Sequence, residues 1–241
     1  VRVPSAADED YRQLHRELIS LKKERTRHTN RIKGLHACQG VKISETQSYE
    51  ERLSADTICD CSKLGSNLRL CLEREYEHIQ LIEEQVKQID DLRATILGTS
   101  QSPEIEQVRN LMKLKGIGIN SAWLFVMEFF AWRTFRNRRE VGALAGLTPT
   151  HNQSGETSRD RGISKAGNSF VRAIVIEIAW GWLRFQPNTK SSLWFQQRYA
   201  HKSKRLRRIG IVALARRLLI DLWRYLDTGE IPPGAVLMNI S

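Results

Sequence analysis

The chain has 241 residues, of which 41% are hydrophobic, and a formal net charge of +11. This hydrophobic fraction is enough for a buried core, which excludes wholesale disorder, and the length allows one or two domains. The sequence contains no run of about eighteen apolar residues, so we expect no membrane span.

The excess of positive charge lies in the second half of the chain. Residues 1–100 carry 16 Lys and Arg against 17 Asp and Glu, whereas the remaining residues carry 22 against 10. A basic field of this size attracts polyanions, chiefly nucleic acid, through phosphate neutralisation and release of counterions. A basic surface that serves only solubility is the alternative.

Residues 1–100 are predicted to form two long helices. Apolar residues recur at steps of three and four in both segments, with Arg25, His28 and Glu75 as polar members of the pattern. Such seven-residue periodicity favours a coiled coil. The two helices can form an antiparallel hairpin, a dimer seam or a pair of ordinary amphipathic helices, and the sequence does not separate these.

No metal site is predicted in this chain. Asp8, Glu9 and Asp10 are adjacent, so they point in different directions on a helix and are interpreted as charge at its N-terminus. Cys59 and Cys61 are separated by one residue, which is not the spacing of a zinc ribbon. Walker, Rossmann and zinc-protease motifs do not occur.

A domain boundary is predicted at residue 100, which divides a coiled-coil region, 1–100, from a helical domain, 101–241. After the break at Gly98, Ser102 is expected to cap a helix that has Pro103 at its first position. The second half reads as short helices around a long polar loop, 151–167, and Asn168 is expected to begin an apolar helix. The predicted fold class is all-α, a long coiled-coil helical hairpin followed by a compact multi-helix domain that contains a helix-hairpin-helix.

The helix-hairpin-helix pattern lies at residues 111–122, where Lys115, Gly116 and Gly118 form the expected turn. Two glycines allow the backbone to approach a phosphate closely, and the amides of such a turn bind the anion without reading sequence. A tight turn between two helices without a ligand is the alternative.

Two basic clusters follow. The first is interleaved with Trp132 and Phe135, as in a groove that binds a nucleic-acid backbone, and consists of Arg133, Arg136, Arg138 and Arg139. Its last three arginines are the candidates for nucleic-acid contact. The last helix and its lead-in carry eight basic residues between 202 and 224, and Lys204, Arg207 and Arg208 are the candidates for phosphate contact. Solvated basic faces remain the alternative for both clusters.

The predicted loop combines groups that suit attack on a phosphodiester. Ser154 offers a hydroxyl nucleophile. Arg159, Arg161 and Lys165 can stabilise charge on the phosphate oxygens, assisted by backbone amides at Asn168. By spacing alone, a Ser-Gly step in a basic loop is more often a solvated turn.

Several motifs of the second half resemble those of a known family. They lie, in order, at residues 146–150, 153–156, 162–168, 176–180 and 207–216. This arrangement resembles the C-terminal domain of the IS-one-ten family of insertion-sequence transposases. Residues 30–35 and the turn at 116–118 also resemble that family, so the resemblance covers nearly the whole chain.

The resemblance implies a DNA transposase and recombinase in which Ser154 is the nucleophile that links covalently to DNA. It further implies a non-coding guide RNA, and Mg²⁺ bound by the acidic DEDD site of a RuvC-like N-terminal domain. That domain is not recognisable in this sequence, so we expect a truncated transposase with no cofactor of its own. We also expect a homo-oligomer formed through the coiled coil and a nucleoid-associated location in the bacterial cytoplasm.

Two other functions remain open. One is a catalytically silent fragment that binds DNA or RNA or dimerises, and the other is a helix-hairpin-helix protein of DNA repair or structure.

Overall fold

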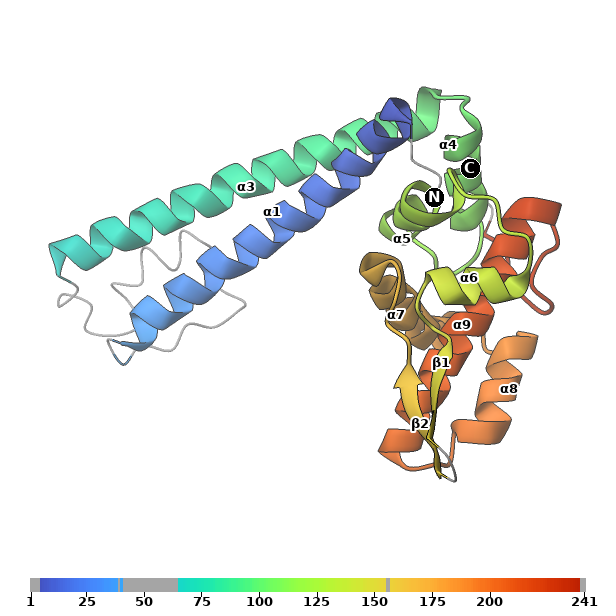
Figure 1. The fold of residues 1–241 in the computed structure, drawn as a ribbon. Helices are drawn as coiled ribbons and strands as arrows, with labels where there is room; N and C mark the ends of the chain where they lie inside the picture. The colour runs from blue at the N-terminus through green and yellow to red at the C-terminus, as the bar shows by residue number, and fades with distance from the viewer. Residues whose placement is uncertain (1–4, 39, 41–64, 155–156, 239–241) are drawn as a thin grey trace. The chain divides into compact units, whose positions relative to one another are not determined.

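The computed structural model describes residues 5–38, 40, 65–154 and 157–238, and for residues 7, 8 and 151–161 it describes the backbone alone. The chain divides into two compact units, one of residues 1–12 and 99–241 and the other of residues 13–98. The described residues are mainly helical, as predicted, with one two-stranded sheet (Figure 1). Within these described residues, no helix has the length and apolar character needed to cross a membrane.

The unit of residues 13–98 is an antiparallel pair of helices, made by α1 (Ala6–Ala37) and α3 (Ser66–Thr99). Its core consists of two apolar clusters. The first joins Leu18 and Leu21 to Ile82 and Ile89, and the second joins Ile32 to Leu72 and Tyr76. From the first cluster to the second, the residue numbers rise on α1 and fall on α3, so the two helices run in opposite directions. The predicted hairpin therefore forms within one chain.

Helix starts in the other unit follow the local sequence. The side chain of Ser102 accepts a hydrogen bond from the amide of Ile105 at the start of α4 (Pro103–Met112), as predicted. Asn168 caps α7 (Ser169–Phe185) in the same way, again as predicted. Polar caps also precede three further helices, α6 (Arg138–Leu144), α8 (Lys190–Tyr199) and α9 (Lys204–Thr228).

Helix α9 is the centre of this unit and packs against α4, α6, α7 and α8. Its apolar face buries residues from Ile211 to Leu222. Gly210 allows the close approach of Tyr199, because a Cβ atom there would lie 2.5 Å from Cγ of the tyrosine ring. Helix α5 (Ile119–Phe125) continues into the π-helix η3 (Val126–Phe130), and all five residues of η3 are buried.

The predicted polar loop at 151–167 is wrong over most of its length. Residues in it form an antiparallel hairpin of β1 (Pro149–Ser154) and β2 (Thr157–Ile163). Ser154 pairs with Thr157, so the two strands are connected by two residues, a length typical of tight hairpins. One extra residue in β2 forms a bulge, next to Gly162 with its positive φ of 87°. The residues on both faces of the hairpin are polar, so the sequence lacks the alternation of apolar and polar residues that predicts a strand.

Candidate functional site

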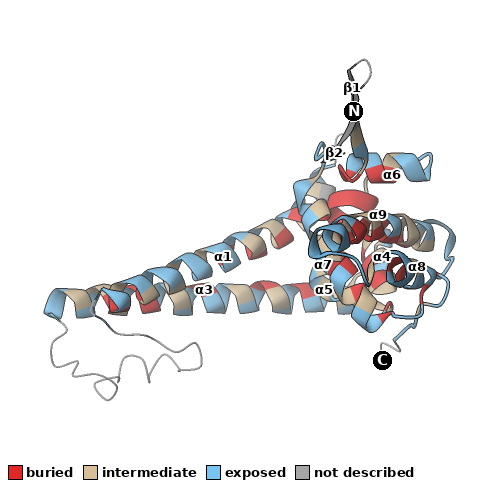
Figure 2. Cartoon of the chain, turned by 90° about the horizontal axis from the view of Figure 1, so that it is seen from below, coloured by how far each residue is buried: buried red, intermediate tan, exposed pale blue. Residues whose placement is uncertain are grey.

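The serine hairpin, β1 and β2, rises from a fixed base. Three backbone amides that follow β2 donate hydrogen bonds to carbonyls at or after the end of α6. Their N···O distances are 2.8 Å for Ser164 to Thr148, 3.1 Å for Lys165 to Gly146 and 3.1 Å for Asn168 to Leu144. The buried residues of this unit gather on the helices around α9 (Figure 2). The base of the hairpin is therefore ordered by main-chain bonds, independently of the side chains along the strands.

The close backbone approach at this base explains one glycine in each of the motifs at 146–150 and 162–168. A Cβ atom on Gly146 would lie 2.6 Å from the carbonyl oxygen of Ala166, and one on Gly167 would overlap the carbonyl of Leu144. Both glycines also have positive φ, 68° and 126°. Between them Lys165 has a φ of 55°, which is unusual for a residue with a side chain. The candidate phosphate ligand Lys165 therefore lies at a constrained turn and is exposed.

A buried carboxylate lies beneath the same turn. Glu128 of η3 is only 2% exposed, and its Oε2 accepts hydrogen bonds from Nη2 and Nε of Arg12 at 2.8 and 3.2 Å. The same oxygen accepts a third bond from Nδ2 of Asn168 at 3.4 Å. The other amide atom of Asn168, Oδ1, accepts from the amides of Phe170 and Val171 at the start of α7. Glu128 thus holds the residue at which the hairpin connection ends and α7 begins.

The sequence did not identify Glu128 as a site residue. A single acid in an apolar helix has no distinctive spacing, and its partners Arg12 and Asn168 lie 116 and 40 residues away. An acid in the strongly apolar run 119–130 was the one available signal, since a buried carboxylate needs a charged or hydrogen-bonding partner.

The first basic cluster separates into a packed arginine and three exposed ones. Arg133 lies over the ring of Trp132, 4.1 Å from its centroid. Burial lowers the pKa of Arg133, the charge of Arg12 lowers it further, and Glu128 opposes both. Arg136, Arg138 and Arg139 are exposed and available to a partner. Only these three exposed arginines therefore remain candidates for nucleic-acid contact.

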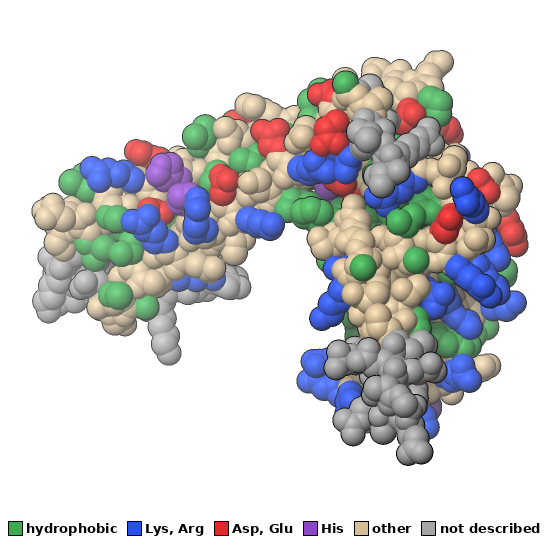
Figure 3. Space-filling model, viewed as in Figure 1, with side chains coloured by type: hydrophobic (Ala, Val, Ile, Leu, Met, Phe, Trp, Pro, Cys, Tyr) green, Lys and Arg blue, Asp and Glu red, His purple; other side chains and the backbone are tan. Residues whose placement is uncertain are grey.

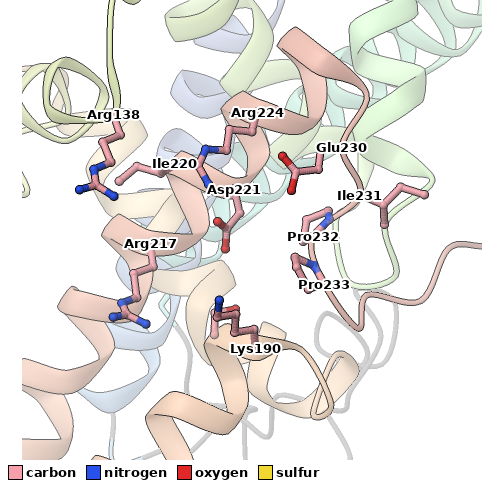
Figure 4. Close-up of a pocket in the computed structure, with 11 residues that line it drawn as sticks. Arg138, Lys190, Arg217, Ile220, Asp221, Arg224, Glu230, Ile231, Pro232 and Pro233 are labelled. Atoms are coloured by element: carbon pink, nitrogen blue, oxygen red, sulfur yellow. The ribbon is translucent and has the colours of Figure 1, made fainter.

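Four cations from three helices converge on one pocket of about 370 Å³ (Figure 4). They are Arg138 of α6, Lys190 of α8, and Arg217 and Arg224 of α9. Two acids, Asp221 and Glu230, line the same pocket, which leaves an excess of positive charge. We call this the cationic pocket. Arg138 is a predicted nucleic-acid ligand, Arg217 and Arg224 belong to the predicted basic cluster of the last helix, and Lys190 has no signal in the sequence.

A second hollow of about 620 Å³ shares Lys190 and Arg217 with the cationic pocket. Trp194 lines it, and the guanidinium of Arg217 lies 3.9 Å from the centroid of the indole ring. An arginine over an aromatic ring offers both charge and a flat stacking surface, which suits phosphates and bases. The two hollows adjoin one another, because the same two cations line both of them.

Asp221 gives the cationic pocket a measurable pH dependence. Burial raises the pKa of Asp221 to about 6, despite the opposing charges of Arg224 and Arg217. Because the folded protein then holds the proton more tightly than the unfolded chain, stability falls as pH rises from about 4 to about 6. Asp221→Asn should therefore stabilise the protein at pH 7 by about 1–3 kcal/mol and have little effect below pH 4. Urea unfolding of both proteins across this pH range measures the difference, and an equal effect at every pH contradicts it.

The lead-in to α9 presents the second basic cluster to solvent. Residues 201–209 are all exposed, including the candidates Lys204, Arg207 and Arg208. Cations at a helix N-terminus oppose the helix dipole, so they do not stabilise the helix that carries them. An anionic partner removes this repulsion. Figure 3 shows many Lys and Arg side chains on the visible face of this unit.

The predicted helix-hairpin-helix corresponds to α4, a turn and α5. Lys115 is exposed in the turn, but its amide donates to the carbonyl of Val236 at 3.1 Å. Gly116 has a φ of 97°, and a Cβ there would lie 3.1 Å from Cβ of Phe185. The positive φ, together with the close approach of Phe185, therefore favours glycine at this position without any ligand. Phosphate contact by Lys115, Gly116 and Gly118 stays a prediction.

Three candidates lie on the part of the hairpin whose side chains are not described. Ser154 is the last residue of β1, and Arg159 pairs across the hairpin with Asn152. Arg161 lies in β2 beside the bulge. Their backbone positions place all three on the hairpin that rises from the base described above.

Comparison with known proteins assigns this arrangement to a family. Residues 108–193 match the family described as Transposase IS116/IS110/IS902, the IS-one-ten family of the sequence resemblance. The chain carries a transposase domain of this family. The matched segment of this transposase domain begins in α4 and ends in α8, so it includes Glu128, the serine hairpin and its base.

Similarity to individual transposases extends over more of the chain. A protein of Sinorhizobium fredii that is named as a transposase, y4rJ, is 39% identical over 98% of this chain. The transposase for insertion sequence element IS1328 of Yersinia enterocolitica is 26% identical over 69% of the chain. The aligned parts cover 62% and 48% of those two proteins, so this chain spans about half to three fifths of its relatives' length.

Proposed function

We propose that this transposase domain cuts and joins DNA through Ser154 during RNA-guided transposition. The Ser154 hydroxyl oxygen attacks a phosphodiester phosphorus and gives its proton to a base. The bond from phosphorus to one deoxyribose oxygen breaks, and that oxygen leaves as a hydroxyl after taking a proton. The DNA strand is then held as a phosphate ester of Ser154, ready for transfer to a second strand end.

The proposal rests on one observation, namely that the base of the serine hairpin, which lies inside the matched segment, is held by defined contacts. Main-chain hydrogen bonds to carbonyls at and after the end of α6, and the buried Glu128–Asn168 contact, fix the base. A nucleophile on the hairpin is therefore attached to a rigid part of the domain. Lys165 at the anchor, and Arg159 and Arg161 on β2, are proposed to hold the attacked phosphate. Magnesium is assigned to the RuvC-like domain of full-length relatives, and not to a site in this chain.

DNA and a guide RNA are the proposed partners. The exposed cations of α6 and of the α9 lead-in, together with the cationic pocket, supply phosphate contacts that do not depend on sequence. This binding is proposed to take place at the nucleoid of a bacterial cell.

Trapping of a covalent adduct tests the proposed chemistry. The protein encoded by the complete reading frame that contains this chain is incubated with Mg²⁺, the guide RNA and DNA that carries the ends of the element. The products are then denatured in detergent. A DNA-linked protein band supports the serine mechanism. Strong DNA binding with no adduct, together with strand exchange, contradicts it. Binding with neither adduct nor exchange favours the silent nucleic-acid-binding fragment.

Arg217→Ala is expected to weaken nucleic-acid binding by this chain about tenfold, since a charge-assisted phosphate contact contributes about 1.5–3 kcal/mol. The loss should be similar for unrelated sequences, and the slope of log affinity against log salt should fall by about one. Fluorescence anisotropy with labelled DNA and RNA measures both quantities. Lys87→Ala, an exposed cation of α3, is the matched control. Equal losses for the two variants would show that net charge alone controls binding.

We propose that the helical hairpin α1 and α3 mediates self-association. Leu70, Leu81 and Leu92 of α3 are 49%, 57% and 46% exposed and are spaced eleven residues apart. Eleven residues make about three helical turns, so these leucines lie along one face of the helix. Sedimentation equilibrium should give a dimer or larger species that Leu81→Lys dissociates. A monomeric parent chain contradicts this proposal.

A further inference from the structure

A polar layer interrupts the apolar contact between the two helices of the helical hairpin. His28 of α1 and Glu75 and His78 of α3 form this layer. Glu75 is the most enclosed of the three, with a side chain only 5% exposed, while that of His28 is 15% exposed. His78 lies at the solvent side. A carboxylate and two imidazoles thus meet at the place where His28 and Glu75 interrupt the apolar pattern of the two helices.

The three side chains are close enough to share one ion. Nδ1 of His28 lies 2.7 Å from Oε2 of Glu75, and the ring centroids of His28 and His78 are 4.9 Å apart. One ligand atom from each residue lies within 4.8 Å of the others. Bonds of about 2.0–2.2 Å in a tetrahedral arrangement place donor atoms roughly 3.3 Å apart. The observed distances between ligand atoms, from 2.7 Å to at most 4.8 Å, lie on both sides of this value, so small side-chain rotations suffice to form the site.

We propose that His28, Glu75 and His78 bind a divalent cation of the zinc class and that the ion clamps α1 to α3. Two imidazole nitrogens and one carboxylate oxygen are the protein ligands of open zinc sites, which leave a fourth position to water. Glu75 and His78 are three residues apart and so lie on one face of α3, facing His28. The exposed side at His78 provides the entry path for the ion and its water.

An outer partner for this site is already in place. Oε1 of Glu75 lies 3.0 Å from Nη1 of Arg31, while Oε2 faces His28. The carboxylate can therefore ligate through Oε2 and keep its bond to Arg31, the arrangement by which outer residues orient metal ligands. The His28–Glu75 contact is then the metal-free form, in which a proton lies between the two atoms.

Titration with cobalt(II) alone, followed by zinc(II), tests the site in the whole chain. The parent is expected to bind one equivalent of cobalt with the visible absorption of a four-coordinate ion, and zinc should displace it. Zinc should also raise the melting temperature of the helical signal. His78→Ala should weaken binding by more than about tenfold, and Arg31→Ala by about 10–100-fold as the loss of an outer partner.

Two controls identify the ligands. His201→Ala removes an exposed histidine of the other unit and should leave cobalt binding unchanged. A chain with all four cysteines replaced by serine should keep the same spectrum. Circular dichroism checks the fold of each variant, and His78→Gln replaces His78→Ala if the latter loses helix. The proposal is overturned by a six-coordinate spectrum, by unchanged affinity in a folded His78 variant, or by loss of binding in either control.

Discussion

Replacing Ser154 with alanine is expected to reduce transposition by about three orders of magnitude or more, because no other hydroxyl takes over the covalent step. The variant should still bind DNA, since the proposed phosphate contacts of α6, α9 and the cationic pocket remain. A transposition assay in cells with the complete reading frame measures the loss. A binding assay on the same variant separates chemistry from recognition.

Ser158→Ala is the matched control for this prediction. Ser158 lies in β2 of the same hairpin, paired with Gln153, so its removal changes the hairpin to a similar degree. Near-parental transposition by Ser158→Ala together with loss in Ser154→Ala assigns the chemistry to one serine. Equal losses in both variants would point to damage of the hairpin itself.

Glu128→Ala should destabilise its unit by about 3–5 kcal/mol, the usual consequence of leaving a buried charge without its partner. The side chain of Arg12 is 10% exposed and would keep the carboxylate of Glu9 and the ring of Trp132, while Asn168 would lose one of its contacts. All six tryptophans lie in residues 123–223, so their fluorescence during urea unfolding reports on this unit alone. Transposition should fall as well, because the base of the serine hairpin loses its support.

Glu106→Ala provides the comparison for Glu128→Ala. Glu106 also pairs with an arginine, at 2.9 Å, but its side chain is 53% exposed. Surface pairs of this kind contribute about 0–1 kcal/mol. A loss for Glu128→Ala as small as that for Glu106→Ala would show that the buried contact does not hold the unit together.

Local signals in the sequence predicted much of the fold. Ser102 and Asn168 cap their helices as expected, because capping depends on a few neighbouring residues. The periodic leucines and isoleucines of α1 and α3 face one another, because burial of an apolar stripe decides that pairing. The hairpin of β1 and β2 was missed because its strands are polar on both faces. The Ser-Gly-Glu-Thr sequence at its tip was the available turn signal.

The candidate site was less predictable, because its support comes from residues far apart in the chain. Arg12 and Glu128 meet across 116 positions, and no spacing rule links them. The cationic pocket likewise gathers Arg138, Lys190 and Arg217 from three helices. Motif resemblance could propose Ser154, Lys165 and Asn168 because those positions lie within one short segment. Only the fold shows that the segment is tied to α6 and to a buried carboxylate.

The identity of the residue joined to DNA tests the central claim most directly. The adduct is digested with protease and nuclease, and tandem mass spectrometry locates the remaining nucleotide on the peptide that contains the hairpin. Our account predicts a nucleotide phosphate ester on the side-chain oxygen of Ser154. A nucleotide on Ser158, on a tyrosine or on any other residue contradicts it.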